Sequence, residues 1–175
     1  LQYALEGTSG NLSTYDISYT IDTSGYNGGW TLLDDVAFKV SSSTPTNLTI
    51  DSAPNGASNW TIVAGGIDAG GCNGHGSGFV CAEANSLSFA AMVPGSSPYV
   101  WQFDITLQTG SLFLGNLQSS IKARYTDGAG NKVGALVSEG ITLQPASPVP
   151  EPASLILLGT GFLGLGSLVR RRLHG

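Results

Sequence analysis

The chain has 175 residues and a net charge of −5, and only 11% of its residues are charged while 25 are glycine. This length fits one domain with a tail, and the scarcity of charge favours turns and short strands over surface helices stabilised by charge pairs. Residues 1–149 hold eleven acidic and four basic residues, a net charge of −7. Nucleic-acid binding needs clustered lysine and arginine, so we expect no nucleic-acid partner.

Apolar and polar residues alternate in four segments, which predicts strands with one buried face. These segments are 15–22, 36–41, 99–108 and 120–127. Weaker candidates are short, rich in β-forming residues and bounded by turn formers. They are 47–51, 60–67, 86–93 and 135–144. Together they predict an all-β, antiparallel β-sandwich, immunoglobulin-like or jelly-roll-like, over residues 1–144.

Aromatic residues offer one candidate binding position. Trp30 follows Gly28 and Gly29 in "YNGGWTLLD", which suggests a loop where an indole ring could stack on a sugar. Trp101 alternates with Phe103 on a predicted strand, so we expect it in the core. Trp30 is therefore the candidate glycan-binding residue.

Carboxylates and hydroxyls give no convincing catalytic site. Adjacent strand residues point to opposite faces, so Asp34 and Asp35 should not share a substrate, and we expect a turn cap. Ser77 lacks the glycines two positions away on each side that a hydrolase elbow needs. Asp127 and Asn131 could bind Ca²⁺ through loop oxygens, but the further acids of a known loop are missing, which favours a simple turn. We predict a protein that is not an enzyme.

The two cysteines, Cys72 and Cys81, enclose a Gly-rich stretch, "NGHGSGFV". A disulfide in an oxidising compartment is the favoured interpretation. Zinc held by Cys72, His75 and Cys81 is the alternative, but it lacks a fourth ligand because His174, the second histidine, lies beyond the apolar tail. We expect neither a metal nor a cofactor.

The amino-acid composition changes in the C-terminal region. Four prolines within 145–152 predict an extended linker. Residues 153–169 carry no charge and, at about 1.5 Å per residue in a helix, reach the short end of the range for a transmembrane helix. Arg170, Arg171 and Arg172 then predict that the tail 170–175 is cytoplasmic and that the body lies on the other side of the membrane.

Two other interpretations of the apolar run are weaker. A buried core helix does not explain why charge is excluded over 17 residues and then returns three times in succession. "GTGFLG" at 159–164 has the G-x-G-x-x-G spacing of a dinucleotide site, but the chain lacks the required βαβ unit and the acidic residue about 20 positions later.

The order of these parts resembles the PEP-CTERM sorting signal of Gram-negative bacteria. "VPEP" supplies Pro150, Glu151 and Pro152, and the apolar run and the arginine cluster follow at the C-terminus. The resemblance covers about 26 residues and implies that exosortase is the processing enzyme and that the chain is its substrate. It says nothing about the fold of the body.

We therefore expect an exported, non-enzymatic protein of the cell surface or extracellular matrix. It would be anchored transiently in the inner membrane and then cleaved at its C-terminal signal. The alternative is a secreted carbohydrate-binding module that acts on exopolysaccharide. The chain begins at Leu1 without a basic and apolar leader, so we expect a secretory signal to have been removed or to lie outside this sequence.

Overall fold

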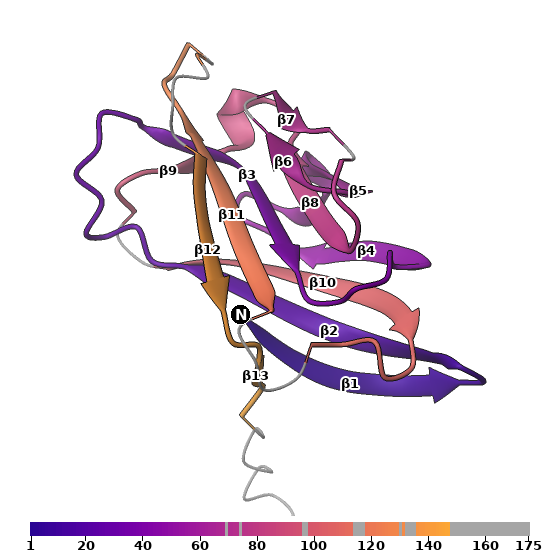
Figure 1. Cartoon of the computed structure of the whole chain (residues 1–175). Helices are drawn as coiled ribbons and strands as arrows, with labels where there is room; N and C mark the ends of the chain where they lie inside the picture. Colours follow the sequence, from indigo (N-terminus) through magenta and orange to yellow (C-terminus); the bar gives the residue numbers. More distant parts are fainter. Residues whose placement is uncertain are drawn as a thin grey trace, which may run out of the picture.

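The computed structural model describes residues 1–68, 70–73, 75–95, 98–113, 118–129, 131 and 136–147. These residues form mainly antiparallel β-sheets with two short 3-10 turns and no α-helix, so the prediction of an all-β body is confirmed for them (Figure 1). The predicted transmembrane helix 153–169 and the tail 170–175 lie outside the described residues, as does the predicted linker from 148 onward. Within the described part of the chain, no helix has the length and apolar character needed to cross a membrane.

The first sheet has the strand order β13-β1-β2-β10-β4. Its strands are β1 (Gln2–Ser9), β2 (Leu12–Ile21), β4 (Asn47–Ser52), β10 (Tyr99–Gln108) and β13 (Gln144–Pro145). Neighbours pair antiparallel, except that β13 runs parallel to β1. The backbone N–H of Ala146 still donates to the Tyr3 carbonyl, so the body holds the chain one residue beyond β13.

The second sheet has the order β12-β11-β3-β8-β5, with β9 also paired to β3. Its strands are β3 (Leu32–Lys39), β5 (Trp60–Ala64), β8 (Phe79–Ala84), β9 (Ala91–Met92), β11 (Ser119–Thr126) and β12 (Leu136–Ile141). The 3-10 turns, η1 (Ala57–Asn59) and η2 (Leu87–Phe89), lie in the connections before β5 and β9. In Figure 1 the strands of this sheet cross those of the first.

One hydrophobic core joins the two sheets. Phe38 of β3 contacts Phe103 of β10 at 4.9 Å between ring centres, and Trp60 of β5 meets Trp101 of β10 edge-on at 5.4 Å. Trp101 and Phe103 are fully buried, as the alternation along 99–108 predicts. Burial of such large rings between two sheets is the main source of stability in a body with few charges.

A short hairpin covers the outer face of the second sheet. It consists of β6 (Ile67–Asp68) and β7 (Gly71–Cys72). Ile67 packs with Ala37 of β3 and Cys81 of β8 in a small second core, where the side chains of all three are buried. As a result β3 is buried on both faces, rather than on the one face that alternation over 36–41 predicts.

The strands predicted from clear alternation of apolar and polar residues are confirmed. Segments 15–22, 36–41, 99–108 and 120–127 fall on β2, β3, β10 and β11, and 47–51 falls on β4. The segment 60–67 divides into β5 and β6, and 135–144 divides into β12 and β13. The prediction for 86–93 was largely wrong: Ser86 caps η2 by accepting from the Ser88 N–H, which leaves only the two-residue β9.

Candidate functional site

An irregularity in β3 places two neighbouring carboxylates beside one arginine. Arg124 of β11 pairs with Asp35 but Tyr125 pairs with Leu33, so Asp34 is an extra residue in the ladder. Such a bulge turns side chains that would otherwise alternate toward one side. Both carboxylates consequently form ion pairs with Arg124 on the outer face of the sheet.

The geometry around Arg124 divides its donors between the two aspartates. Its Nη2 lies 2.7 Å from Asp34 Oδ2 and its Nε lies 3.2 Å from Asp34 Oδ1, which is a bidentate pair. The same Nε also forms an ion pair with Asp35 Oδ2. The predicted turn cap at Asp34 and Asp35 is therefore wrong, because both residues lie within a strand and bind a buried guanidinium.

A third carboxylate completes the group. Glu83 of β8 is the direct cross-strand partner of Asp35, and its Oε1 lies 4.0 Å from Arg124 Nη2. The group therefore has three carboxylates and one guanidinium. We call these four residues, Asp34, Asp35, Glu83 and Arg124, the buried charge cluster.

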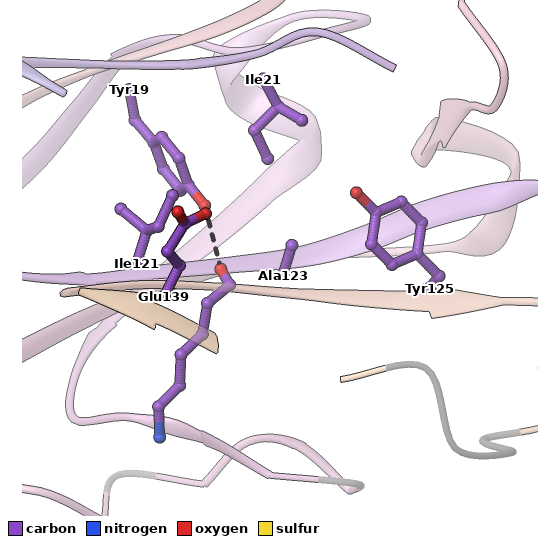
Figure 2. A pocket seen from close by; sticks show the side chains of 7 residues that line it. Tyr19, Ile21, Ile121, Ala123, Tyr125 and Glu139 are labelled. Carbon is purple, nitrogen blue, oxygen red and sulfur yellow. Dashed lines mark hydrogen bonds between the residues drawn. The ribbon is translucent and has the colours of Figure 1, made fainter. Parts of the chain in front are cut away.

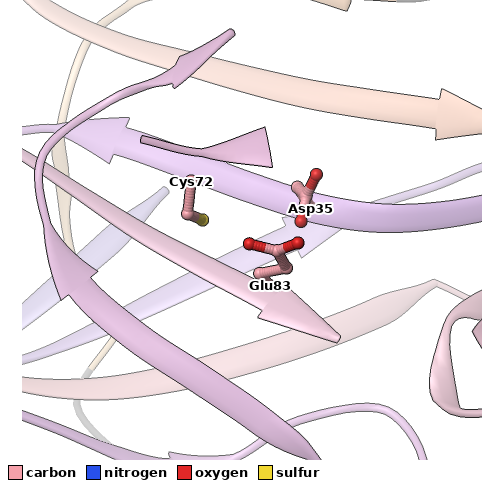
Figure 3. Close-up of side chains that lie close together, drawn as sticks. All are labelled: Asp35, Cys72 and Glu83. Atoms are coloured by element: carbon pink, nitrogen blue, oxygen red, sulfur yellow. The ribbon is translucent and has the colours of Figure 1, made fainter. Parts of the chain in front are cut away.

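The hairpin closes over the buried charge cluster. Gly71 has φ +112°, and a Cβ there would lie 3.1 Å from both Arg124 Nη1 and Glu83 Oε1, so any side chain would push into the charged groups. The next residue, Cys72, is joined to Cys81 by a disulfide, which confirms that prediction. Figure 3 shows Cys72 from the hairpin beside Asp35 and Glu83 from the sheet.

Burial changes the proton affinity of the cluster. Loss of solvent and the neighbouring Asp34 raise the pKa of Asp35 to about 8, although Arg124 opposes this shift. Burial lowers the pKa of Arg124, but its hydrogen bonds and charge pairs with the carboxylates outweigh burial and raise it overall. Asp35 is thus much harder to ionise than an ordinary aspartate, while Arg124 remains charged.

The cluster also contains atoms that could hold a metal ion. One ligand atom from each of Asp35, Cys72 and Glu83 lies within 4.8 Å of the others. While Cys72 is in the disulfide it offers no thiolate, which is the form that binds metals. His75, which the zinc alternative included, is exposed and is not a member of this group.

A second feature is a hollow of about 150 Å³ at the seam between β2 of the first sheet and β11 and β12 of the second. Tyr19, Ile121 and Tyr125 line it, and the Tyr19 hydroxyl donates to the Lys122 carbonyl at 3.1 Å (Figure 2). The exposed Glu139 lies beside the opening. The hollow therefore combines aromatic walls with one carboxylate.

The outer face of the first sheet carries an acidic row. Asp16 of β2 and Asp104 of β10 are direct cross-strand partners, and bulges in β1 and β4 place Glu6 and Asp51 near them. Burial, and after it the charge of Asp51, raises the pKa of both Asp16 and Asp104. In contrast to the buried charge cluster, no arginine or lysine forms an ion pair with this row among the described residues.

The other candidate positions have ordinary surroundings. Trp30 is half-buried and packs against the main core, and glycan binding by its ring stays a prediction. Asp127 accepts hydrogen bonds from the Ala129 and Asn131 backbone N–H groups and from the Asn131 side chain. This geometry is that of a turn, in agreement with the favoured interpretation.

Comparison with known proteins places the chain by its C-terminus. A two-sheet, all-β body with one disulfide precedes the tail, and a model of the PEP-CTERM protein-sorting motif matches residues 148–172. The chain carries a C-terminal PEP-CTERM sorting motif, as the resemblance predicted, and such a motif implies export and sorting to the cell envelope with exosortase processing. No curated protein matches the chain.

The match includes Pro150, Glu151, Pro152 and the three arginines from Arg170 to Arg172. All of these residues lie outside the described part of the structure, so their individual roles stay predictions.

Sequence reasoning missed the buried charge cluster. Its members lie at positions 34, 35, 83 and 124, and only the strand pairing brings them together. One signal was present: Arg124 is one of only four basic residues in 1–149, and it falls on a predicted strand. An arginine that a strand buries requires an ionic partner, although Lys122 on the same strand gives the same signal.

Proposed function

We propose that this chain is an exported, non-enzymatic protein of the cell surface or extracellular matrix, released through cleavage of its C-terminal signal. The single observation that carries the proposal is the PEP-CTERM match over residues 148–172. The disulfide agrees with an oxidising compartment outside the cytoplasm. We further propose that the two sheets form a β-sandwich of immunoglobulin-like or jelly-roll-like type, whose task is to be displayed or deposited.

The tail would act in two steps. Residues 153–169 form a helix that anchors the chain transiently in the inner membrane, and Arg170 to Arg172 hold its cytoplasmic end. The prolines on either side of Glu151 keep the peptide at the outer interface extended, which is the conformation that a protease requires. Among the described residues, the hydrogen bond nearest the tail is at Ala146, and three residues (Ser147, Pro148 and Val149) separate Ala146 from Pro150 in the sequence, so cleavage would occur close to the folded body.

The test is replacement of Glu151 in a host that has exosortase. We expect Glu151→Ala to leave membrane insertion intact but to block removal of the tail, so that the intact mass stays that of the full chain. Glu139→Ala is the matched control, because it removes an exposed glutamate from the body and should be processed normally. Processing of Glu151→Ala at the parental rate would refute recognition of this glutamate.

Carbohydrate binding is the second candidate, and the seam hollow is the observation that favours it. Tyrosine rings and a carboxylate at an opening are the groups that bind sugar rings and their hydroxyls. Tyr26 stacks on Tyr125 at 5.0 Å beside the hollow, which would fix the ring that a sugar meets.

Retention on insoluble polysaccharides tests this candidate. Under it, Glu139→Gln weakens retention and Trp30→Ala, on a residue packed against the core, has less effect as long as the fold is kept. Absence of retention on every polysaccharide would remove the candidate without affecting the sorting proposal.

A further inference from the structure

Three potential metal ligands converge at the hairpin, and a fourth, Cys81, is bonded to one of them. Cys81 and Glu83 are two residues apart on β8, so their side chains share the outer face of the second sheet. Asp35 faces Glu83 across the strand pair, and Cys72 approaches from the hairpin above. The ligand atoms of Asp35, Glu83 and Cys72 lie within 4.8 Å of one another, and the Cys81 sulfur is bonded to that of Cys72.

The carboxylate of Asp35 belongs to this group and carries a buried oxygen without a hydrogen-bond partner. Asp35 is fully buried, and its Oδ1 accepts no hydrogen bond. Arg124 makes its bidentate contact with Asp34 and forms an ion pair only with Oδ2 of Asp35. A fully buried oxygen without a partner is costly, and a cation is one group that could satisfy it.

We propose that the reduced protein binds one thiophilic divalent cation, Zn²⁺, through Cys72, Cys81, Asp35 and Glu83. The disulfide and the metal are then alternative states of one site. Two thiolates and two carboxylates form a four-ligand set that zinc accepts in tetrahedral geometry. Arg124 orients Asp35 through its ion pair and is not itself a ligand.

The exchange between the disulfide state and the metal-bound state begins with reduction of the disulfide. A dithiol reductant transfers two electrons and two protons to the Cys72–Cys81 bond, which breaks to give two thiols while the donor becomes a disulfide. Zinc binding then releases to solvent the two thiol protons and the proton that the raised pKa of Asp35 keeps on its carboxyl group. A disulfide oxidant reverses the exchange: it accepts two electrons from the two thiolates and two protons from solvent to become a dithiol, and formation of the Cys72–Cys81 bond removes both thiolate ligands and expels the metal.

The charges of the site explain why only the reduced form binds. In the disulfide form three carboxylates face one guanidinium, and only two of those carboxylates point at the position beside Cys72. Two carboxylates beside a fixed guanidinium are a poor set for a soft dication. Reduction adds two negative sulfurs at the same position, which outweigh the repulsion from Arg124.

Cobalt titration of the full-length chain in detergent tests the proposal. The protein is reduced with a phosphine, desalted without oxygen and titrated with Co²⁺, which reports tetrahedral thiolate coordination by its visible and charge-transfer bands. We expect saturation at one equivalent, displacement of Co²⁺ by Zn²⁺, and no such bands for the disulfide form. A reduced protein without these bands, or a disulfide form that binds equally well, would overturn the proposal.

Two carboxylate variants separate this site from simple thiol binding. Glu83→Gln and Asp35→Asn should each weaken the affinity by at least about 10-fold, since even residues that only orient ligands have that effect. The side chain of Glu83 is 41% exposed, so Glu83→Gln is expected to fold even where Asp35→Asn does not. Unchanged affinity in Glu83→Gln would overturn the proposed ligand set.

His75→Ala is the matched control, because it removes the ligand that sequence spacing alone would add to the cysteines. It should bind Co²⁺ like the parent. A loss of binding in this variant, together with normal binding in Glu83→Gln, would assign the site to Cys72, His75 and Cys81 instead and contradict the proposal.

Discussion

The outer faces of both sheets carry more acidic than basic side chains, but the acidic groups have different surroundings on the two faces. On the second sheet the buried charge cluster sets three carboxylates around Arg124 and lies beneath the disulfide-bonded hairpin. On the first sheet Asp16 faces Asp104 in an acidic row without an ion-paired cation among the described residues, and no hairpin covers it there.

This difference indicates that the degree of burial, more than the number of charges, determines how strongly these carboxylates affect stability. Asp16 and Asp104 are half-buried, so solvent screens their repulsion in part, although each keeps one buried oxygen without a hydrogen-bond partner. Beneath the hairpin, Asp34, Asp35 and Arg124 are almost fully buried and the pKa of Asp35 rises to about 8, while Glu83 at the edge stays 41% exposed. The covered face should therefore respond strongly to substitution and the open face weakly.

Removal of the arginine gives the largest expected effect. Arg124→Ala leaves Asp34 and Asp35 buried without a counter-charge, and we expect the free energy of unfolding to fall by about 3 to 5 kcal/mol. Urea denaturation of the full-length chain in detergent measures this. A loss below about 1 kcal/mol, the range of exposed pairs, would show that the cluster behaves like the open face.

Removal of the disulfide should rank second. The double variant Cys72→Ser with Cys81→Ser loses the closure of a loop with a sequence separation of 9, which corresponds to about 2 to 3 kcal/mol of stability. The reduced parent, kept free of metal, is the matched control and should lose a similar amount. A variant as stable as the oxidised parent would mean that the hairpin stays in place without its covalent link.

The stability of the protein should also depend on pH through Asp35. The folded pKa of Asp35, about 8, lies above its ordinary value of 3.8, so between these values the folded state holds a proton that the unfolded chain releases. The free energy of unfolding should therefore decrease as pH rises from about 4 to about 8. Asp35→Asn should flatten this slope in urea denaturation at a series of pH values. A slope that persists unchanged in Asp35→Asn would assign it to other groups.

The smallest effect is expected on the open face. Asp104→Asn removes one of two like charges on adjacent strands and should raise the free energy of unfolding at neutral pH by about 0.2 to 1 kcal/mol. The direction agrees with the raised pKa of Asp104, whose ionised form the fold disfavours. Destabilisation by this substitution would contradict the view that the row repels itself.

The sequence predicts the parts of this fold that depend on one strand at a time. Alternation along 99–108 anticipates both the strand β10 and the burial of Trp101 and Phe103. β1 was missed because its residues are mostly exposed and the pairing shifts at Glu6, which interrupts the period of two. β8 was missed because it shows no alternation: the three consecutive residues Val80, Cys81 and Ala82 are all buried.

The buried charge cluster depends on information that alternation does not contain. The rule that neighbours in a strand face opposite ways is correct for a regular ladder, but the bulge at Asp34 breaks it. The pairing of β3 with both β11 and β8 then decides which residues meet. The disulfide could be predicted because it involves the only two cysteines of the chain.

The central claim is that the chain is an exported protein whose C-terminal signal is removed. The most direct measurement is the intact mass of the extracellular form in a host with exosortase and in the same host without it. We predict a chain that ends near Pro150 to Pro152 in the first host and a full-length, membrane-bound chain in the second. An extracellular form that keeps Arg170 to Arg172 in the presence of exosortase would contradict the claim.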